Sequence, residues 1–283
     1  MTNQIKTTVL LAVLTVMILI IGQAMGGRGG LFIAFILAVI MNFGSYWFSD
    51  KIVLAIYRAE KIDPNEGSQL YATVRELAQA AGLPMPRLYL VPDESPNAFA
   101  TGRNPENAVV AVTQGILNTL SQAELRGVLA HELGHIRNHD ILISSIAATL
   151  AGAIMILADI GKFAVIFGAG RGDDEDSGGG IVATLVMAIV APIAAMLIQS
   201  AISRSREFLA DSAGAQISNS PESLANALLR LEQGRVAVPM DASPATAHMM
   251  IVNPLSGRNV LNLFSTHPPT EERVRRLREM EHI

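Results

Sequence analysis

The chain has 283 residues, a length that fits one large domain or two smaller ones. Only 16% of the residues are charged, against roughly 25% in a typical soluble domain, whereas 50% are hydrophobic and the mean hydropathy is +0.37. This balance indicates a membrane protein with a soluble portion, and a net charge of −4 without a long basic stretch argues against nucleic-acid binding. Cysteine is absent, which excludes disulfides and leaves histidine, carboxylate or water as the ligands of any metal.

Four apolar runs approach the ~20 residues that a helix needs to cross a bilayer, and all four are essentially free of charge. They cover residues 7–25, 31–48, 141–158 and 181–202. A cleaved signal peptide is the alternative for the first run, but no clear small-x-small cleavage site follows it. A pair of buried core helices is the alternative for the third and fourth runs, but these lack polar faces. The sequence therefore predicts an α-helical membrane protein with four transmembrane helices.

Basic residues beside the runs predict the orientation, because lysine and arginine concentrate on the cytoplasmic side of a membrane protein. They precede the first run and follow the second and the fourth: Lys6, Lys51, Arg58, Lys61, Arg204 and Arg206. The loop between the third and fourth runs is glycine-rich and acidic, and the loop between the first two holds Arg28 as its one basic residue. Both termini are therefore expected in the cytoplasm.

This topology divides the chain into two membrane segments and two cytoplasmic segments. Residues 1–50 hold two transmembrane helices, residues 51–140 a first cytoplasmic part, residues 141–202 two more transmembrane helices around the extracytoplasmic acidic and glycine-rich loop, and residues 203–283 a second cytoplasmic part. Helical periodicity in "PNEGSQLYATVRELAQAAGLP" stands beside short β-rich runs, "RLYLVPD" and "AVVAVTQ". We therefore expect the cytoplasmic parts to form one α+β domain.

The motif "HELGH" spans His131 to His135 inside "SQAELRGVLAHELGHIRNH", a predicted helix that Ser121 and Glu124 begin as a capping box. Residues i and i+4 share one helical face, so the two imidazoles can reach one zinc ion. Glu132 is placed to take a proton from a water molecule at that ion. A surface helix with two solvated histidines is the alternative, but the glycine inside the motif suggests close packing.

A third protein ligand must come from elsewhere, because the longer motif that supplies a third histidine along the same stretch is not present. On a continuous helix, His135 lies about 9 Å below the start of the third run, and Glu207 lies about 8 Å beyond the end of the fourth. Two adjacent antiparallel spans then bring Glu207 level with the histidines, and Asp211, at i+4, can accept the other N–H of a ligand histidine. A surface charge is the alternative for Glu207, and Glu124 and Asp140 are the next candidate carboxylates.

"HELGH", "SRSREFLAD" and "STHPP", in this order around two apolar runs, resemble the HtpX family of bacterial membrane metalloproteases, which is related to the CAAX prenyl proteases and the Oma-type proteases. "NAFATG" matches a further element of that family. The resemblance implies a gluzincin-type endopeptidase with one zinc ion per chain, in the bacterial cytoplasmic (inner) membrane, with its site facing the cytoplasm. It also implies a role in the quality control of misfolded or damaged membrane proteins. Four spans disfavour the large chamber of a prenyl-peptide protease.

In the expected mechanism the three ligands leave a fourth position to water, and Glu132 takes a proton from that water and passes it to the leaving amine. His267, in "STHPP", is the expected second donor to the oxyanion, with His248 as its competitor. Arg273 matches a family position near the substrate backbone, and an ordinary surface arginine is its alternative.

Asn97, Ala98, Phe99 and Ala100 are expected to bind substrate, because the extended stretch "NAFAT" can serve as an edge strand to which a peptide adds. A plain loop is the alternative for this stretch. Unfolded polypeptides and membrane proteins are the expected substrates, within reach of the lipid bilayer. Self-cleavage is expected in the irregular residues 236–263, which are rich in Pro, Met and Asn.

The rival function is a non-proteolytic metal-binding membrane scaffold or chaperone. Glu132 argues against it, because a structural zinc site needs no adjacent base and favours four protein ligands. A small transporter, suggested by Pro192 and the acidic loop, is a weaker rival, since no ionisable residue lies within a span. Nothing in the sequence specifies an oligomeric state.

Overall fold

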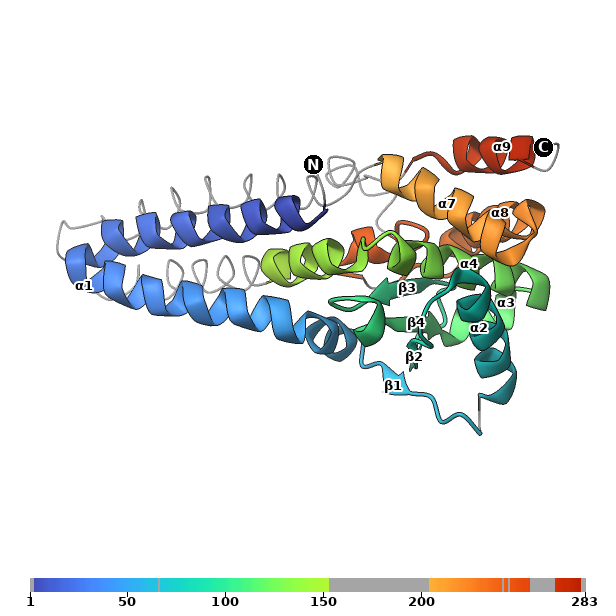
Figure 1. Ribbon diagram of the computed structural model, residues 1–283, viewed down its shortest axis with the longest axis horizontal. Helices are drawn as coiled ribbons and strands as arrows, with labels where there is room; N and C mark the ends of the chain where they lie inside the picture. The colour runs from blue at the N-terminus through green and yellow to red at the C-terminus, as the bar shows by residue number, and fades with distance from the viewer. Residues whose placement is uncertain are drawn as a thin grey trace.

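The computed structural model describes residues 3–65, 67–152, 204–240, 242–243, 245–254 and 268–280. A helical hairpin formed by α1 (Asn3–Ile56) extends along the long axis, away from a part that contains the sheet and most of the other helices (Figure 1). The second part mixes helices with a small sheet, as the α+β prediction requires.

The long helix α1 folds back on itself because two consecutive glycines interrupt it. Gly26 and Gly27 leave helical geometry, and Gly27 takes φ 54° and ψ −135°, a conformation that residues with a side chain avoid. Beside this turn the two arms touch, since a Cβ added to Gly22 would lie 2.6 Å from the carbonyl oxygen of Gly30. The first two predicted spans are therefore the two arms of one hairpin (Figure 1).

Among the described residues, one helix, Gly26–Ile56, is long and apolar enough to cross a membrane. Two shorter apolar helices, Thr7–Ile20 and Ile141–Gly152, coincide with the first predicted span and with the start of the third. Many large apolar side chains of α1 are exposed, as expected for a helix that faces lipid. The rest of the third predicted span, the acidic loop and the fourth span lie outside the described residues.

The sheet has four strands in the order β1–β2–β4–β3. They are β1 (Glu60–Lys61), β2 (Arg87–Val91), β3 (Ala98–Thr101) and β4 (Val109–Thr113). β2 and β4 are parallel, whereas β3 runs antiparallel to β4 with Ala100 beside Val110. The strands predicted in "RLYLVPD" and "AVVAVTQ" are confirmed, and β3 is an edge strand of this sheet.

Helices from both halves of the chain surround the catalytic-motif helix α4. The helices are α2 (Ser68–Ala81), α3 (Gln114–Thr119), α4 (Gln122–Arg137), α7 (Arg204–Ser218), α8 (Pro221–Ala237) and α9 (Thr270–Met280), with the short 3₁₀ helices η1 (Pro105–Asn107) and η2 (Ala247–Met249). α4 packs against α2, α7, α8 and β3 (Figure 1). Its Leu129 and Leu133 are fully buried in the core that these elements share.

α4 begins at the capping box that the sequence predicts. The Ser121 hydroxyl accepts the N–H of Glu124 at 3.3 Å, and the Glu124 carboxylate accepts the N–H of Ser121 at 2.8 Å. Arg230 of α8 also pairs with Glu124, at 3.1 Å. The Glu124 carboxylate is therefore committed to the start of α4 and not to a metal site at its other end.

α4 ends at Arg137, and the expectation of one continuous helix into the third apolar run is wrong. His139 takes a left-handed φ of 57°, and the N–H of Asp140 donates to the carbonyl of His135 at 3.0 Å, which closes the end of the helix. A separate helix begins at Ile141. The distances below the bilayer that assume a straight helix therefore do not describe this protein.

Candidate metal centre

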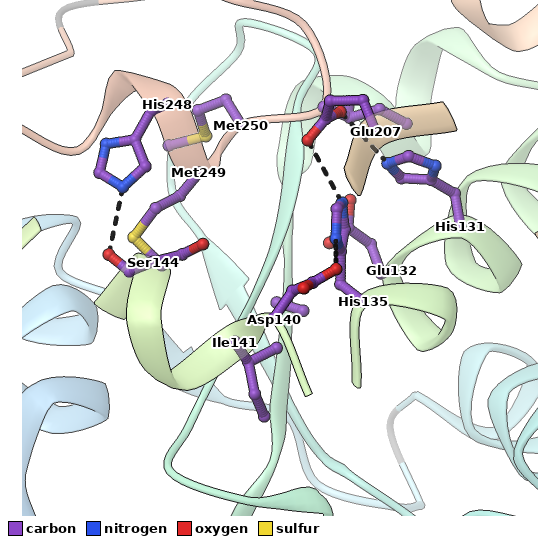
Figure 2. Close-up of a pocket in the computed structure, with 12 residues that line it drawn as sticks. His131, Glu132, His135, Asp140, Ile141, Ser144, Glu207, His248, Met249 and Met250 are labelled. Atoms are coloured by element: carbon purple, nitrogen blue, oxygen red, sulfur yellow. Dashed lines mark hydrogen bonds and ion pairs between the residues drawn. The ribbon is translucent and has the colours of Figure 1, made fainter. Parts of the chain in front are cut away.

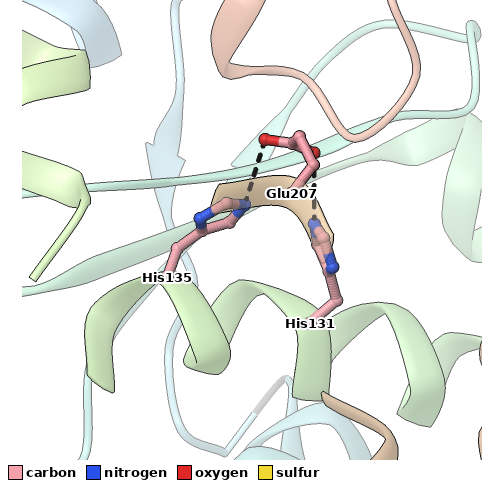
Figure 3. Close-up of side chains that lie close together, drawn as sticks. All are labelled: His131, His135 and Glu207. Carbon is pink, nitrogen blue, oxygen red and sulfur yellow. Dashed lines mark ion pairs between the residues drawn. The ribbon is translucent and has the colours of Figure 1, made fainter. Parts of the chain in front are cut away.

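Three side chains from two helices converge on one point (Figure 3). His131 and His135 lie one turn apart on α4, and Glu207 lies in the first turn of α7. The Glu207 carboxylate is 3.9 Å from Nε2 of His131 and 3.6 Å from Nε2 of His135, and one ligand atom from each residue lies within 4.8 Å of the others. Donor atoms that share one tetrahedral zinc ion at 2.0–2.1 Å lie roughly 3.4 Å apart, so this spacing fits a metal ion.

The other ring nitrogen of each histidine faces a carboxylate. Nδ1 of His131 lies 2.9 Å from Asp211, and Nδ1 of His135 lies 3.4 Å from Asp140. Such pairs fix the tautomer and the ring orientation, and they leave Nε2 to coordinate a metal. Asp211 therefore lies behind His131, and Asp140, an alternative ligand in the sequence analysis, lies behind His135.

Sequence reasoning missed the role of Asp140 because it assumed a continuous helix. On such a helix, a residue five positions after His135 does not face it. The available signal was the Asn138–His139 pair, since asparagine and histidine are enriched in the left-handed conformation that ends helices.

Arg273 of α9 holds Asp211 in place. Its Nε and Nη2 donate to the two Asp211 carboxylate oxygens at 2.8 and 2.6 Å, and the arginine is only 2% exposed. Burial would raise the pKa of Asp211, but Arg273 and His131 hold that pKa at about 2. The alternative of an ordinary surface arginine is wrong, because the buried guanidinium holds the carboxylate that contacts His131 and also lies 3.5 Å from the His131 ring.

Glu132 is buried beside the ligands, where the N–H of Ala100 donates to it. Burial raises the pKa of Glu132 to about 7, with His135 opposing the rise and Glu207 adding to it. Burial alone would lower the pKa of His135, but Asp140, Glu207 and Glu132 together raise it to about 9. The carboxylates around His135 therefore favour positive charge at that ring, whereas burial lowers the pKa of His131.

A small cavity lies at this point (Figure 2). Its volume is about 30 Å³, enough for one or two water molecules. Its lining comes from four parts of the chain: Ala100, His131, Glu132, His135, Asp140, Ile141, Ser144, Glu207, His248, Met249, Met250 and Ile251. The ligands are thus accessible to water but covered by residues 248–251.

The predicted substrate-binding residues lie along and just before β3. Ala100 lines the cavity, whereas the Phe99 side chain is fully buried in the core. The carbonyl of Ala98 accepts the N–H of Ile251 at 3.1 Å, and the Asn97 side chain is also buried. The edge that was expected to receive a substrate strand is therefore contacted by a later part of this chain.

The structure describes only one of the two candidate oxyanion donors. His267 lies outside the described residues. His248 lines the cavity, with its Nε2 3.1 Å from the carbonyl oxygen of Ser144 (Figure 2). A carbonyl oxygen can only accept a hydrogen bond, so Nε2 of His248 must carry the hydrogen. The N–H of His248 therefore points to the carbonyl of Ser144.

The ligands meet because the backbones of α4 and α7 are in contact. A Cβ added to Gly214 of α7 would lie 2.9 Å from the Cα of His131, and one added to Gly134 of α4 would lie 2.9 Å from the carbonyl oxygen of Ala210. A larger residue at either position must therefore move one helix away from the other.

Gly214→Ala should weaken metal binding, because it pushes α7 and its two carboxylates away from the histidines. We expect an affinity loss of roughly 10–100-fold, the range for disturbed partners of ligating histidines. Competition with a chromogenic chelator measures it. Gly44→Ala is the matched control, since a Cβ there meets nothing within 4 Å. Equal affinity in the two variants would contradict the role of this contact.

Asp140→Ala should also weaken metal binding, by about tenfold or more, because His135 loses the carboxylate that orients it. Asp140→Asn should lose less, and the exposed control Asp63→Ala should lose nothing. The absorption spectrum of bound Co²⁺ provides a second measurement, since it reports ligand geometry. An unchanged spectrum and affinity in Asp140→Ala would reduce Asp140 to a helix-capping residue.

Comparison with known proteins places this geometry in a family. Residues 64–281 match the model of peptidase family M48. Proteins named "Protease HtpX homolog" are 62% identical over 282 residues in Syntrophobacter fumaroxidans (99% of this chain, 100% of the relative), 57% over 277 residues in Desulfatibacillum aliphaticivorans (98% and 89%), and 55% over 277 residues in Thermococcus kodakarensis (98% and 95%).

A solved structure shares the fold. The crystal structure of S. mikatae Ste24p aligns with a TM-score of 0.53 at 19% identity, covering 97% of this chain and 65% of that one. The family match spans most of the chain, and the relatives align along nearly all of it. These findings favour the protease over the non-proteolytic scaffold: the chain belongs to peptidase family M48, among proteins similar to HtpX, and is a membrane metalloprotease.

Proposed function

We propose that the metal is zinc and that the protein is a zinc endopeptidase. The observation that carries this proposal is the donor set, in which two imidazoles and the Glu207 carboxylate lie within 4.8 Å of one another. Two histidines with one glutamate are a known ligand set of catalytic zinc, which keeps one position open. The carboxylates behind both imidazoles and the adjacent Glu132 support a catalytic site and not a purely structural one.

Zinc bound there would act as a Lewis acid that polarises the scissile carbonyl and acidifies water. Glu132 is placed to take a proton from the attacking water and to pass it to the leaving amine. A pKa near 7 suits a group that must both accept and donate a proton at neutral pH. Asp211 and Asp140 keep the imidazoles oriented during this exchange.

We propose His267 as the donor that stabilises the oxyanion. Its support is its position in "STHPP", directly before α9, whose Arg273 reaches the metal centre. The competitor His248 directs its Nε2 to a backbone carbonyl. A donor of this kind typically contributes about 10²–10³ to kcat.

We propose that the substrates are unfolded polypeptides and the cytoplasmic segments of misfolded or damaged membrane proteins. In this proposal the chain has four transmembrane helices in the bacterial cytoplasmic membrane, and residues 51–140 and 203–283 form a gluzincin-type domain in the cytoplasm. The basic flanks of the apolar runs support the orientation. The apolar helix at Ile141–Gly152, six residues after His135, supports a site close to the bilayer surface.

Glu132→Gln should lower proteolysis by several orders of magnitude but leave about one zinc ion per chain, because Glu132 is not itself a ligand. We expect a loss of about 10²–10⁴-fold in kcat on an unfolded, fluorescently labelled substrate. Metal analysis of the same sample measures zinc. Glu106→Gln, at an exposed glutamate, is the control and should keep full activity. A chelator should abolish the activity of the wild type. Full activity of Glu132→Gln would refute the proposed mechanism.

The orientation has its own test, because the chain has no cysteine of its own. In intact cells, a membrane-impermeant thiol reagent should label a cysteine placed at Ser177, in the acidic loop, and should not label one placed at Ser220. Labelling of both positions after the membrane is opened is the control. The reverse pattern in intact cells would place the site outside the cytoplasm.

A further inference from the structure

Residues 245–252 cross the metal centre and are buried along their whole length. Met250 is fully buried, and Ile251 and Val252 are 2% and 6% exposed. Outside the cavity, the hydroxyl group of Thr246, which belongs to the segment, shares a hydrogen bond with the hydroxyl group of Tyr57. Residues 248–251 of the segment line the same cavity as the ligands and Ala100 of β3, and Figure 2 shows His248, Met249 and Met250 there. Apart from η2, this segment has no regular secondary structure, and its residues 248–251 cover the ligands.

The backbone of this segment bends after η2 and is bound at two consecutive residues. The N–H of Ile251 donates to the carbonyl of Ala98, at 3.1 Å, and the carbonyl of Ile251 accepts from Arg273 Nη1, at 3.0 Å. The carbonyl of the next residue, Val252, accepts from the Asn97 side-chain amide at 3.0 Å. The first of these bonds joins two main chains at an edge strand, which is how a peptide is held in β-augmentation, and the other two come from side chains.

The position of the segment leaves no room for a second peptide. Met249, Met250 and Ile251 line the cavity together with the ligands, and that cavity measures about 30 Å³. This is enough for water but not for one amino-acid residue. A substrate that reaches the ligands along β3 must therefore take the place of these residues.

We propose that residues 249–252 are an internal substrate mimic that occupies the peptide-binding cleft and competes with substrate. This inference rests on the proposed endopeptidase function, and it names the regulation and the substrate class of the same site. The occupants of the cleft are Met, Met, Ile and Val, so the cleft accepts apolar segments, which folded proteins bury and unfolded proteins expose. Methionine side chains adapt to irregular space, which suits a segment that must leave and return.

The proposal can be tested by weakening the hydrogen bond from the N–H of Ile251 to the carbonyl of Ala98, which should release the mimic. Ile251→Pro removes the N–H that donates to Ala98, and Ile251→Ala removes most of the apolar side chain. Because an occupied cleft raises the apparent KM, both variants should lower the KM for an unfolded substrate, Ile251→Pro by roughly three- to tenfold, with kcat unchanged. Val238→Ala, an equally apolar but half-exposed position before the segment, should change neither.

A peptide-binding experiment tests the same inference without hydrolysis. The probe is a fluorescent peptide with the sequence of residues 247–254, AHMMIVNP, added to zinc-loaded Glu132→Gln protein. Fluorescence anisotropy should show tighter binding when Ile251→Pro or Ile251→Ala is added to Glu132→Gln, and a scrambled peptide should not bind. Comparable far-UV circular dichroism and zinc content of all variants show that they are folded.

The outcomes separate the inference from the proposed function. Lower KM and tighter peptide binding in the Ile251 variants support the mimic. An unchanged or higher KM, or peptide binding no tighter than in Glu132→Gln alone, overturns it and makes residues 249–252 a fixed wall of the cleft. If no protein hydrolyses the substrate but the Ile251 variants bind the peptide more tightly, the endopeptidase proposal fails and the internal occupant of the cleft stands.

Discussion

The contact between the backbones of α4 and α7 is the constraint on which the metal centre depends. Gly134 and Gly214 remove the side chains that would keep the helices apart, and the ligands of α4 then face the carboxylates of α7. Glu207 and Asp211 are one turn apart, so a single docking event places a ligand between the imidazoles and a hydrogen-bond acceptor behind one of them. The same approach fixes Arg273, because α9 must reach Asp211.

The two histidines are supported in different ways. His131 depends on tertiary structure, since Asp211 comes from α7 and is itself held by Arg273. His135 depends on local structure, since Asp140 follows it directly at the end of α4. The contact between Asp211 and His131 requires α7 to pack against α4. The contact between Asp140 and His135 requires only the turn that ends α4.

Local signals explain which parts of the structure could be predicted from the sequence. The capping box, the helix with its histidine pair and the strands follow from patterns within a few residues, and Glu207 follows from its motif and its place after an apolar run. The depth argument for Glu207 assumed a straight helix, which His139 breaks, so its agreement with the structure came from the order of the elements and not from the distances. Residues 245–252 could not be predicted, because they have no periodic pattern. Their conformation is fixed by partners far away in sequence, among them Tyr57, Ala98 and Arg273.

The break at His139 also determines how a movement of the bilayer would reach the ligands. If α4 continued as one rigid rod, any tilt of the apolar helix at Ile141–Gly152 would turn both imidazoles together. The left-handed residue breaks this rod, so a tilt of that helix need not turn α4 with it. Asp140 lies within this break, 3.4 Å from Nδ1 of His135, whereas the carboxylate partner of His131 lies on α7, so a tilt would reach the imidazole of His135 first.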